Sequence, residues 1–174
     1  CAIGTSALYS NTNGGSNIAI GSNSLYTNTT GSNNIAIGPA ALQSNTTAGP
    51  NIAIGSSALQ YNTYGGASYT NIAIGHIAMR FNTTGDANIA IGYQSLNANT
   101  TGWGTYNTGL GHYALAANGT GYNNVAVGWQ ALATNTFGNY NTAVGYGAMS
   151  SNSTGGQNTA IGSSALAYNT YGVY

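Results

Sequence analysis

The stretch NIAIGSNSLYTNTTGSN, residues 17–33, is followed at once by NIAIGPAALQSNTTAGP, residues 34–50. Variants of the same pattern recur along all 174 residues, and each contains a Gly that closes an AIG-like motif. The ten glycines, called the bend glycines below, are Gly4, Gly21, Gly38, Gly55, Gly75, Gly92, Gly111, Gly128, Gly145 and Gly162. They are spaced 17 residues apart, except for one interval of 20 and one of 19 residues. A fixed period of this size is typical of solenoid proteins, in which each repeat forms one coil.

Two short strands are predicted in each coil, with positions counted from the bend glycine. Positions −3 and −1 are mostly Ile or Val with a small residue between them, as in Ile18 and Ile20, and this alternation indicates a strand. Position +4 is Leu or Met in all ten units, and we expect a second strand there, because the Gly between the two runs disfavours a helix. The sequence therefore predicts an all-β fold: a parallel β-solenoid (β-roll) of ten coils, with about 17 residues and two short strands per coil, as a single repeat domain over residues 1–174.

An asparagine turn closes each coil. Position +7 is Asn in every unit, usually followed by Thr, and Gly stands three positions later in nine of the ten units, which is typical of a turn. Because stacked coils lie roughly 4.8 Å apart, these amides can hydrogen-bond along the stack. The predicted Asn ladder consists of Asn11, Asn28, Asn45, Asn62, Asn82, Asn99, Asn118, Asn135, Asn152 and Asn169. The two longer units add residues near this turn, at Gly65 to Thr70 and at Trp103 to Tyr106, so we place these insertions in loops.

The near absence of charge excludes several functions. Arg80 and Asp86 are the only charged side chains, and we expect them to form an exposed salt bridge across one Asn turn. Paired carboxylates, a catalytic triad and a basic surface for nucleic acid are all missing. His76 and His112 would lie two coils apart, on the order of 9–10 Å, which is too far to share a metal ion. We therefore expect no catalysis, no metal and no cofactor, and no stretch reaches the roughly 18 apolar residues of a membrane span.

The repeat resembles two known families. An N-x-A-I-G strand, a Gly bend and a second segment of small residues, from Ala2-Ile3-Gly4 to Thr159-Ala160-Ile161-Gly162, resemble the head repeats of YadA-like trimeric autotransporter adhesins and repeats in phage-type tail-fibre proteins. The adhesin heads usually have a shorter period, and the N-T-T-G extension is more similar to the tail-fibre sequences. The resemblance implies a left-handed β-roll with three chains side by side, exposed on a cell or virion surface and used for attachment. It carries over no catalytic residues.

These observations lead to one function and one alternative. We expect an extracellular structural or adhesive fibre protein whose copies associate laterally, and the near match of register between the two ends also favours head-to-tail stacking within a longer array or a filament. The alternative is an ice-binding β-solenoid, since uncharged regular coils with Thr rows can order water. Against it, Thr is concentrated in the turns and is interrupted there by Tyr64, Phe137 and Tyr171.

Two sets of surface residues are candidate sites. Position +1 becomes aromatic in five consecutive coils and could stack on sugar rings; this aromatic stripe is His76, Tyr93, His112, Trp129 and Tyr146. The competing interpretation is that these rings only cover a flank or a groove between chains. Six turns also contain the sequon N-x-S/T, which makes them candidate glycosylation sites: Asn28, Asn45, Asn82, Asn99, Asn118 and Asn152.

Overall fold

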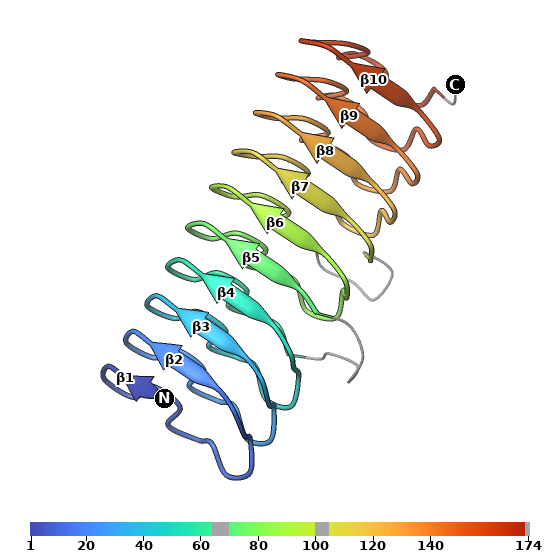
Figure 1. Cartoon of the computed structure of the whole chain (residues 1–174). Helices are drawn as coiled ribbons and strands as arrows, with labels where there is room; N and C mark the ends of the chain where they lie inside the picture. Colours follow the sequence, from blue (N-terminus) through green and yellow to red (C-terminus); the bar gives the residue numbers. More distant parts are fainter. Residues whose placement is uncertain (64–69, 100–104, 173–174) are drawn as a thin grey trace.

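A computed structural model describes residues 1–63, 70–99 and 105–172 as an elongated all-β solenoid with the two termini at opposite ends (Figure 1). Ten short strands follow one another in a single parallel sheet, in the order β1 to β10. They are β1 (Ala2–Ile3), β2 (Ile18–Ile20), β3 (Ile35–Ile37), β4 (Ile52–Ile54), β5 (Ile72–Ile74), β6 (Ile89–Ile91), β7 (Thr108–Leu110), β8 (Val125–Val127), β9 (Thr142–Val144) and β10 (Thr159–Ile161). The described part of the chain contains no helix. The predicted parallel β-solenoid is therefore confirmed.

The strand register places equivalent residues directly above one another. Ile35 pairs with Ile52, and Ile52 pairs with Ile72 although that unit is longer. The same holds across the second long unit, where Ile89 pairs with Thr108. The predicted insertions, Gly65 to Thr70 and Trp103 to Tyr106, lie mostly outside the described residues, but the strands on both sides stay in register. Ten strands enclose nine complete turns of the chain.

The interior of the coil is narrow and is filled by Ala, Leu and Met. In each strand the middle residue points inward and its neighbours point outward, so Ala19 is fully buried whereas Ile18 is 37% exposed. The large apolar side chains that are fully buried all come from position +4, such as Leu42, Leu59 and Met79. These residues pack with the strand alanines in one continuous cluster. The Ile and Val side chains of the strands are therefore not core residues.

The predicted second strand is wrong: the segment around position +4 is a stack of turns. All ten residues at position +4 have φ between 48° and 53°, and all ten at position +2 have φ between 51° and 61°. This left-handed conformation is incompatible with a pleated strand. The coils remain hydrogen-bonded here, because Asn23 N donates to Thr5 O below (2.9 Å) and Leu25 N donates to Ala41 O above (3.0 Å). The regular spacing of apolar residues indicates that the residue at position +4 is buried, but it does not predict the left-handed backbone conformation there.

The bend glycines pack against the backbone of the next coil. Gly38 has φ 130°, which L side chains rarely adopt, and a Cβ at this position would lie 2.6 Å from both the C and O atoms of Gly55. The same approach recurs from one bend glycine to the next along the stack. Only Gly therefore allows the coils to stack this closely.

The predicted Asn ladder forms over nine of its ten members. From Asn11 to Asn152, the Nδ2 of each Asn donates to the Oδ1 of the one before, over 2.7–3.2 Å. From Asn28 to Asn152 these side chains are fully buried. Asn169 does not join the ladder, since its Nδ2 donates to Gly172 O at 3.4 Å and the Oδ1 of Asn152 has no partner.

A second Asn ladder, which the sequence analysis missed, occupies position −4. Asn34 N donates to Asn17 Oδ1 (2.9 Å) and Asn51 N donates to Asn34 Oδ1 (3.0 Å), and the pattern continues to Asn158. The two ladders meet at a turn carbonyl: Ala48 O accepts from both Asn34 Nδ2 and Asn45 Nδ2, each at 2.9 Å. Two amide columns thus link every turn to its own coil and to the next one.

The glycine contacts predict a large difference between two Gly→Ala variants. Gly38→Ala introduces both a backbone clash and a strained φ, so we expect it to lower the free energy of unfolding by about 3 kcal/mol or more. Gly15→Ala is the matched control, because its Cβ meets no atom within 4 Å, and it should change stability by less than about 0.5 kcal/mol. Thermal and denaturant unfolding followed by circular dichroism measures both values, and equal effects would contradict the close-approach model.

The buried ladder predicts a pH-dependent defect for Asn135→Asp. Asn135 Nδ2 donates to Asn118 Oδ1 and Gly138 O, both at 2.9 Å, so a carboxylate here would face two acceptors in a buried site. Burial raises the pKa of such a carboxyl above its unfolded value, and the neutral acid, which can still donate one hydrogen bond, is favoured. The variant should therefore be most stable near pH 3–4 and lose roughly 2 kcal/mol or more as the pH rises to 7.

The exposed Asn13 provides the control for this experiment. Asn13→Asp carries the same charge change on the surface, so its stability relative to the unmodified chain should be nearly constant between pH 3.5 and 7. A similar pH profile for both variants would mean that the ladder does not impose the penalty.

Candidate functional site

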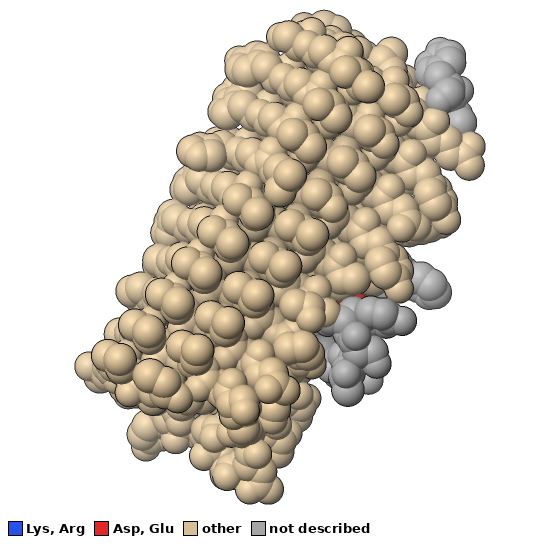
Figure 2. All heavy atoms as spheres, viewed as in Figure 1, with Lys and Arg blue, Asp and Glu red and all other residues tan. Residues whose placement is uncertain are grey.

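The strands present an aliphatic face to solvent, formed by the side chains at positions −3 and −1. It consists of Ile3, Ile18, Ile20, Ile35, Ile37, Ile52, Ile54, Ile72, Ile74, Ile89, Ile91, Thr108, Leu110, Val125, Val127, Thr142, Val144, Thr159 and Ile161. The face has no charged residue. In Figure 2 the side chains form regular rows across the strands, and no Lys or Arg is visible in this view.

The aliphatic face is regular, because equivalent residues pair in register from strand to strand. Rows on successive strands are separated by roughly 4.8 Å, and the −3 and −1 columns by about 6.7 Å, which follows from the geometry of a parallel sheet. Ile91 is 40% exposed and Val125 37% exposed in the middle of the solenoid, where both neighbouring strands are present. Monomeric soluble proteins rarely expose apolar patches larger than a few hundred Å², and a patch of this kind usually marks an interaction surface.

Comparison of the repeats within the chain indicates which side of each strand forms this outward face. Eight of the nine three-residue strands have Ala in the middle and the ninth has Gly109, whereas the flanking positions vary among Ile, Val, Leu and Thr. A position that tolerates only the smallest side chains is typical of a narrow interior. Alternation alone shows that the residues at positions −3 and −1 point to one side of the strand and the residue at position −2 to the other. The restriction to small side chains at position −2 identifies that side as the interior.

The structure brings the aromatic stripe together as two separate stacks. His76 stacks on Tyr93 with ring centroids 5.7 Å apart, Tyr93 contacts His112 at 6.2 Å, and Trp129 stacks on Tyr146 at 4.7 Å with an interplanar angle of 12°. Within the described residues, no ring contact joins His112 to Trp129. Trp129 and Tyr146 each cover one face of the other ring but remain 40% and 58% exposed, and the rings of Tyr93 and His112 are tilted by 55°. The sugar contact at this stripe stays a prediction.

The neighbourhood of the stripe offers no metal site. The described residues contain no group of three or more His, Cys, Asp or Glu side chains that could hold an ion. Next to the stripe, Tyr113 meets Tyr93 edge to face at 5.3 Å, and desolvation together with the nearby Tyr93 phenol raises the pKa of Tyr113.

The candidate glycosylation sites are inaccessible in the folded coil. Asn28, Asn45, Asn82, Asn99, Asn118 and Asn152 are all 0% exposed. Their side-chain nitrogens are donors in the first Asn ladder; Asn118 Nδ2, for example, donates to Asn99 Oδ1 (3.0 Å) and Gly121 O (2.8 Å). A glycan on this nitrogen would have to displace the coil above or below. The sequons follow from the turn sequence itself, and glycosylation at these sites stays a prediction that the burial of the side-chain nitrogens argues against.

The expected salt bridge between Arg80 and Asp86 does not form among the described residues. Arg80 Nε donates to Gln60 Oε1 (2.8 Å), and its guanidinium lies over the rings of Phe81 (5.1 Å) and Tyr61 (5.7 Å). Partial burial raises the pKa of the Asp86 carboxyl, whose Oδ1 has no hydrogen-bond partner. Arg80 lies at position +5 and Asp86 at position −6, so the two charges belong to different columns of the solenoid.

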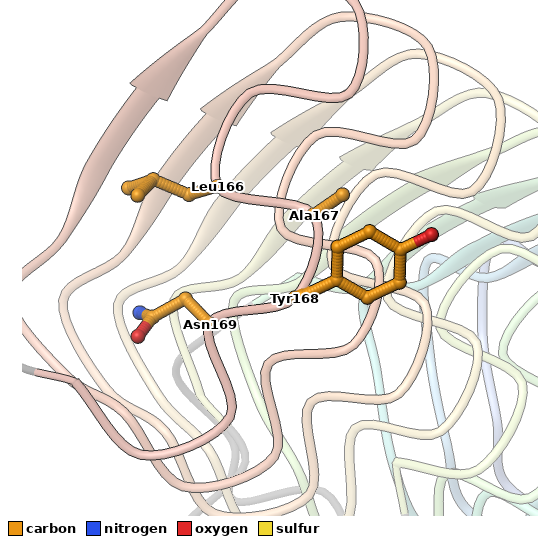
Figure 3. Close-up of a pocket in the computed structure, with 4 residues that line it drawn as sticks. All are labelled: Leu166, Ala167, Tyr168 and Asn169. Atoms are coloured by element: carbon orange, nitrogen blue, oxygen red, sulfur yellow. The ribbon is translucent and has the colours of Figure 1, made fainter.

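A hollow of ≈ 490 Å³ lies on the open side of the last coil (Figure 3). It is lined by Leu166, Ala167, Tyr168 and Asn169. Leu166 and Asn169 point into the coil and Tyr168 points away from it. Leu166 is 40% exposed, whereas the equivalent Leu132 is fully buried between two coils, so this hollow is the uncovered interior of one coil rather than a built site.

Among the residues that the structure describes, no helix is long and apolar enough to cross a membrane. Comparisons with protein-family models, with curated protein sequences and with solved structures found no match to this chain.

Proposed function

We propose that this chain is a repeat module of an extracellular structural or adhesive fibre, in which copies associate side by side through the aliphatic face. The observation that supports this most strongly is the face itself: nine turns of parallel sheet with two columns of mostly Ile and Val side chains that are half-buried or exposed. An isolated solenoid would leave this apolar surface in water.

A second copy of the same chain is the partner that best fits this face. The face is uncharged, so identical copies meet without like-charge repulsion. Rows of Ile side chains, separated by the distance between neighbouring strands, can interdigitate with an identical set of rows. Both solenoids have the same period, so the rows match along the whole contact. The resemblance to YadA-like heads and tail fibres suggests three chains around one axis, each contributing its sheet to a shared apolar centre.

A bundle of this kind is suited to attachment at a cell or virion surface. With the apolar faces turned inward, the turns and the other exposed side chains would face outward and repeat on each chain. Several identical sites on one rod raise the effective concentration of each further contact, so weak individual contacts can give strong attachment. No catalytic step is part of this proposal.

Ice binding is the second candidate, and the aliphatic face gives it specific support. Three strand positions carry Thr in the −3 column, at Thr108, Thr142 and Thr159. Thr is thus not confined to the turns, and a regular grid of methyl groups and hydroxyls is the kind of surface that could order water. In this alternative the face stays exposed and the chain stays monomeric.

If the chains associate laterally as proposed, the protein has the mass of three chains in solution. Charged substitutions on the aliphatic face should dissociate this trimer. The chain has a mass of 17.5 kDa, so light scattering after size exclusion should give about three times this value. Ile54→Lys combined with Ile74→Lys places repeated charges at the proposed contact, and association should weaken at least about 100-fold while circular dichroism is unchanged. Thr47→Lys, in an exposed turn, is the control and should leave the mass unchanged. A monomeric parent chain at high micromolar concentration would refute the fibre proposal.

The same samples separate the two candidates. The ice-binding candidate predicts thermal hysteresis for the unmodified chain and its loss in the Ile54→Lys, Ile74→Lys variant. An oligomeric chain without hysteresis would exclude the second candidate.

A further inference from the structure

Four consecutive coils carry a pattern of tyrosines and amides where the Asn turn returns to the strand, at positions −6 and −5. The tyrosines are Tyr106, Tyr122 and Tyr140, and the amides that alternate with them are Asn123, Asn139 and Gln157. A hollow of ≈ 350 Å³ is lined by Thr105, Tyr106, Tyr122 and Asn123. A second hollow of ≈ 290 Å³ lies between Tyr122, Asn139, Tyr140, Thr154, Gly156 and Gln157. Both hollows share Tyr122, so they are adjacent along the solenoid.

The tyrosine rings here are arranged differently from those of the aromatic stripe. Tyr122 and Tyr140 meet edge to face, with centroids 5.3 Å apart and an interplanar angle of 78°. In this arrangement the ring that contributes its edge has neither face covered by the other ring. Tyr106 is 52% exposed and Tyr140 is 53% exposed, so both side chains are accessible to solvent, one on each side of Tyr122.

The amides supply oriented polar groups beside these rings. Asn139 Oδ1 accepts a hydrogen bond from Tyr122 N at 2.9 Å. This bond fixes the side chain and leaves the two N–H groups of its amide as donors at the second hollow. Gln157 and Thr154 line the same hollow with a further amide and a hydroxyl. No charged residue lines either hollow.

The backbone at two of the tyrosine positions also accommodates Asn. Tyr106 and Tyr140 have φ of 57° and 58° at position −5, where the equivalent Asn33 and Asn123 have φ of 61° and 55°. Asn adopts this left-handed conformation at lower cost than a bulky aromatic residue. Asn is therefore compatible with both sites, and the left-handed φ itself belongs to the stack, because Ser16, Ala87 and Gln157 share it at the same position (55°, 56° and 61°).

We infer that Tyr106, Tyr122 and Tyr140, with Asn139 and Gln157, form a binding site for a neutral glycan that lies along the solenoid. Open aromatic faces stack on the apolar faces of sugar rings, and amides and hydroxyls hydrogen-bond to sugar hydroxyl groups. The absence of charge favours a glycan without carboxylate or sulfate groups, and the two adjacent hollows favour an oligosaccharide over a single sugar. This inference deepens the attachment role proposed above and rests on it.

Binding of defined oligosaccharides tests the inference. A panel of immobilised neutral glycans, including cellohexaose, chitohexaose and maltohexaose, is compared with an acidic heparin hexasaccharide, and the affinity of each binder is then measured by calorimetry. Tyr122→Ser and Tyr140→Asn replace the tyrosines with residues that the same positions hold in coil three, Ser32 and Asn33. Each variant should lose about three- to tenfold in affinity for the neutral glycan.

Two controls separate loss of the site from loss of the fold. Tyr9→Ser removes a 70% exposed tyrosine that stacks on Tyr26 in the first coils, and affinity should not change. Tyr140→Asn relieves a strained φ, so its melting temperature should be equal to or higher than that of the parent chain. Loss of affinity without loss of stability is the expected combination, and a purely structural tyrosine would give the reverse.

Three outcomes would overturn the inference: no neutral glycan on the panel binds, the heparin hexasaccharide binds more tightly than every neutral glycan, or Tyr9→Ser weakens binding as much as Tyr122→Ser. The mass of each sample is measured in parallel. A trimeric chain that binds no glycan would refute the site and retain the fibre, whereas a monomer that binds through Tyr122 would refute lateral association and retain the site.

Discussion

The close approach of successive bend glycines is the constraint on which the rest of the structure depends. Because the backbone of one coil nearly touches that of the next at the bend, the rise per coil is fixed at the spacing of hydrogen-bonded strands. Every side chain then has its own equivalents roughly 4.8 Å above and below it. A column can contain only residues that tolerate a copy of themselves at that distance: methyl groups, aliphatic chains, stacked rings and amides that both donate and accept. Lys, Arg, Asp and Glu do not meet this condition, which explains a chain of 174 residues with one cationic and one anionic side chain.

The asparagines show how far this reasoning could proceed from sequence. The ladder at position +7 was predicted, because an Asn at the same place in every repeat has an obvious amide partner in the next coil. The ladder at position −4 was missed although Asn34 and Asn51 are just as regular, because there the side chain accepts from a backbone N–H and donates to a turn carbonyl. Such a pattern depends on where the turn folds relative to the strand, and periodicity contains no information about that.

The segment around position +4 shows a different limit. Leu59 and its equivalents are regularly spaced and buried, and both properties suit a strand, yet each has a left-handed φ near 50°. Leucine has no intrinsic preference for that conformation, so no local propensity predicts it. It is imposed by the stack, where the N–H groups of this segment must alternate between the coil above and the coil below. Tertiary hydrogen bonding thus overrides the preference of the residue, and only coordinates reveal it.

Because Ala, Leu, Met and Asn fill the interior, variation among the coils is confined to the outside, and there two kinds of aromatic column have different consequences. When the same position is aromatic in successive coils, as at Trp129 and Tyr146, the rings stack at about the coil spacing and cover each other's faces. When the aromatic residue alternates between two neighbouring positions, as from Tyr122 to Tyr140, the rings cannot stack in parallel, and hollows lined by amides open between them. Moving the aromatic residue by one position between successive coils therefore replaces a stack of parallel rings with a surface on which ring faces are accessible. In a fold whose every coil otherwise repeats the last, this departure from the repeat is where specific recognition can arise.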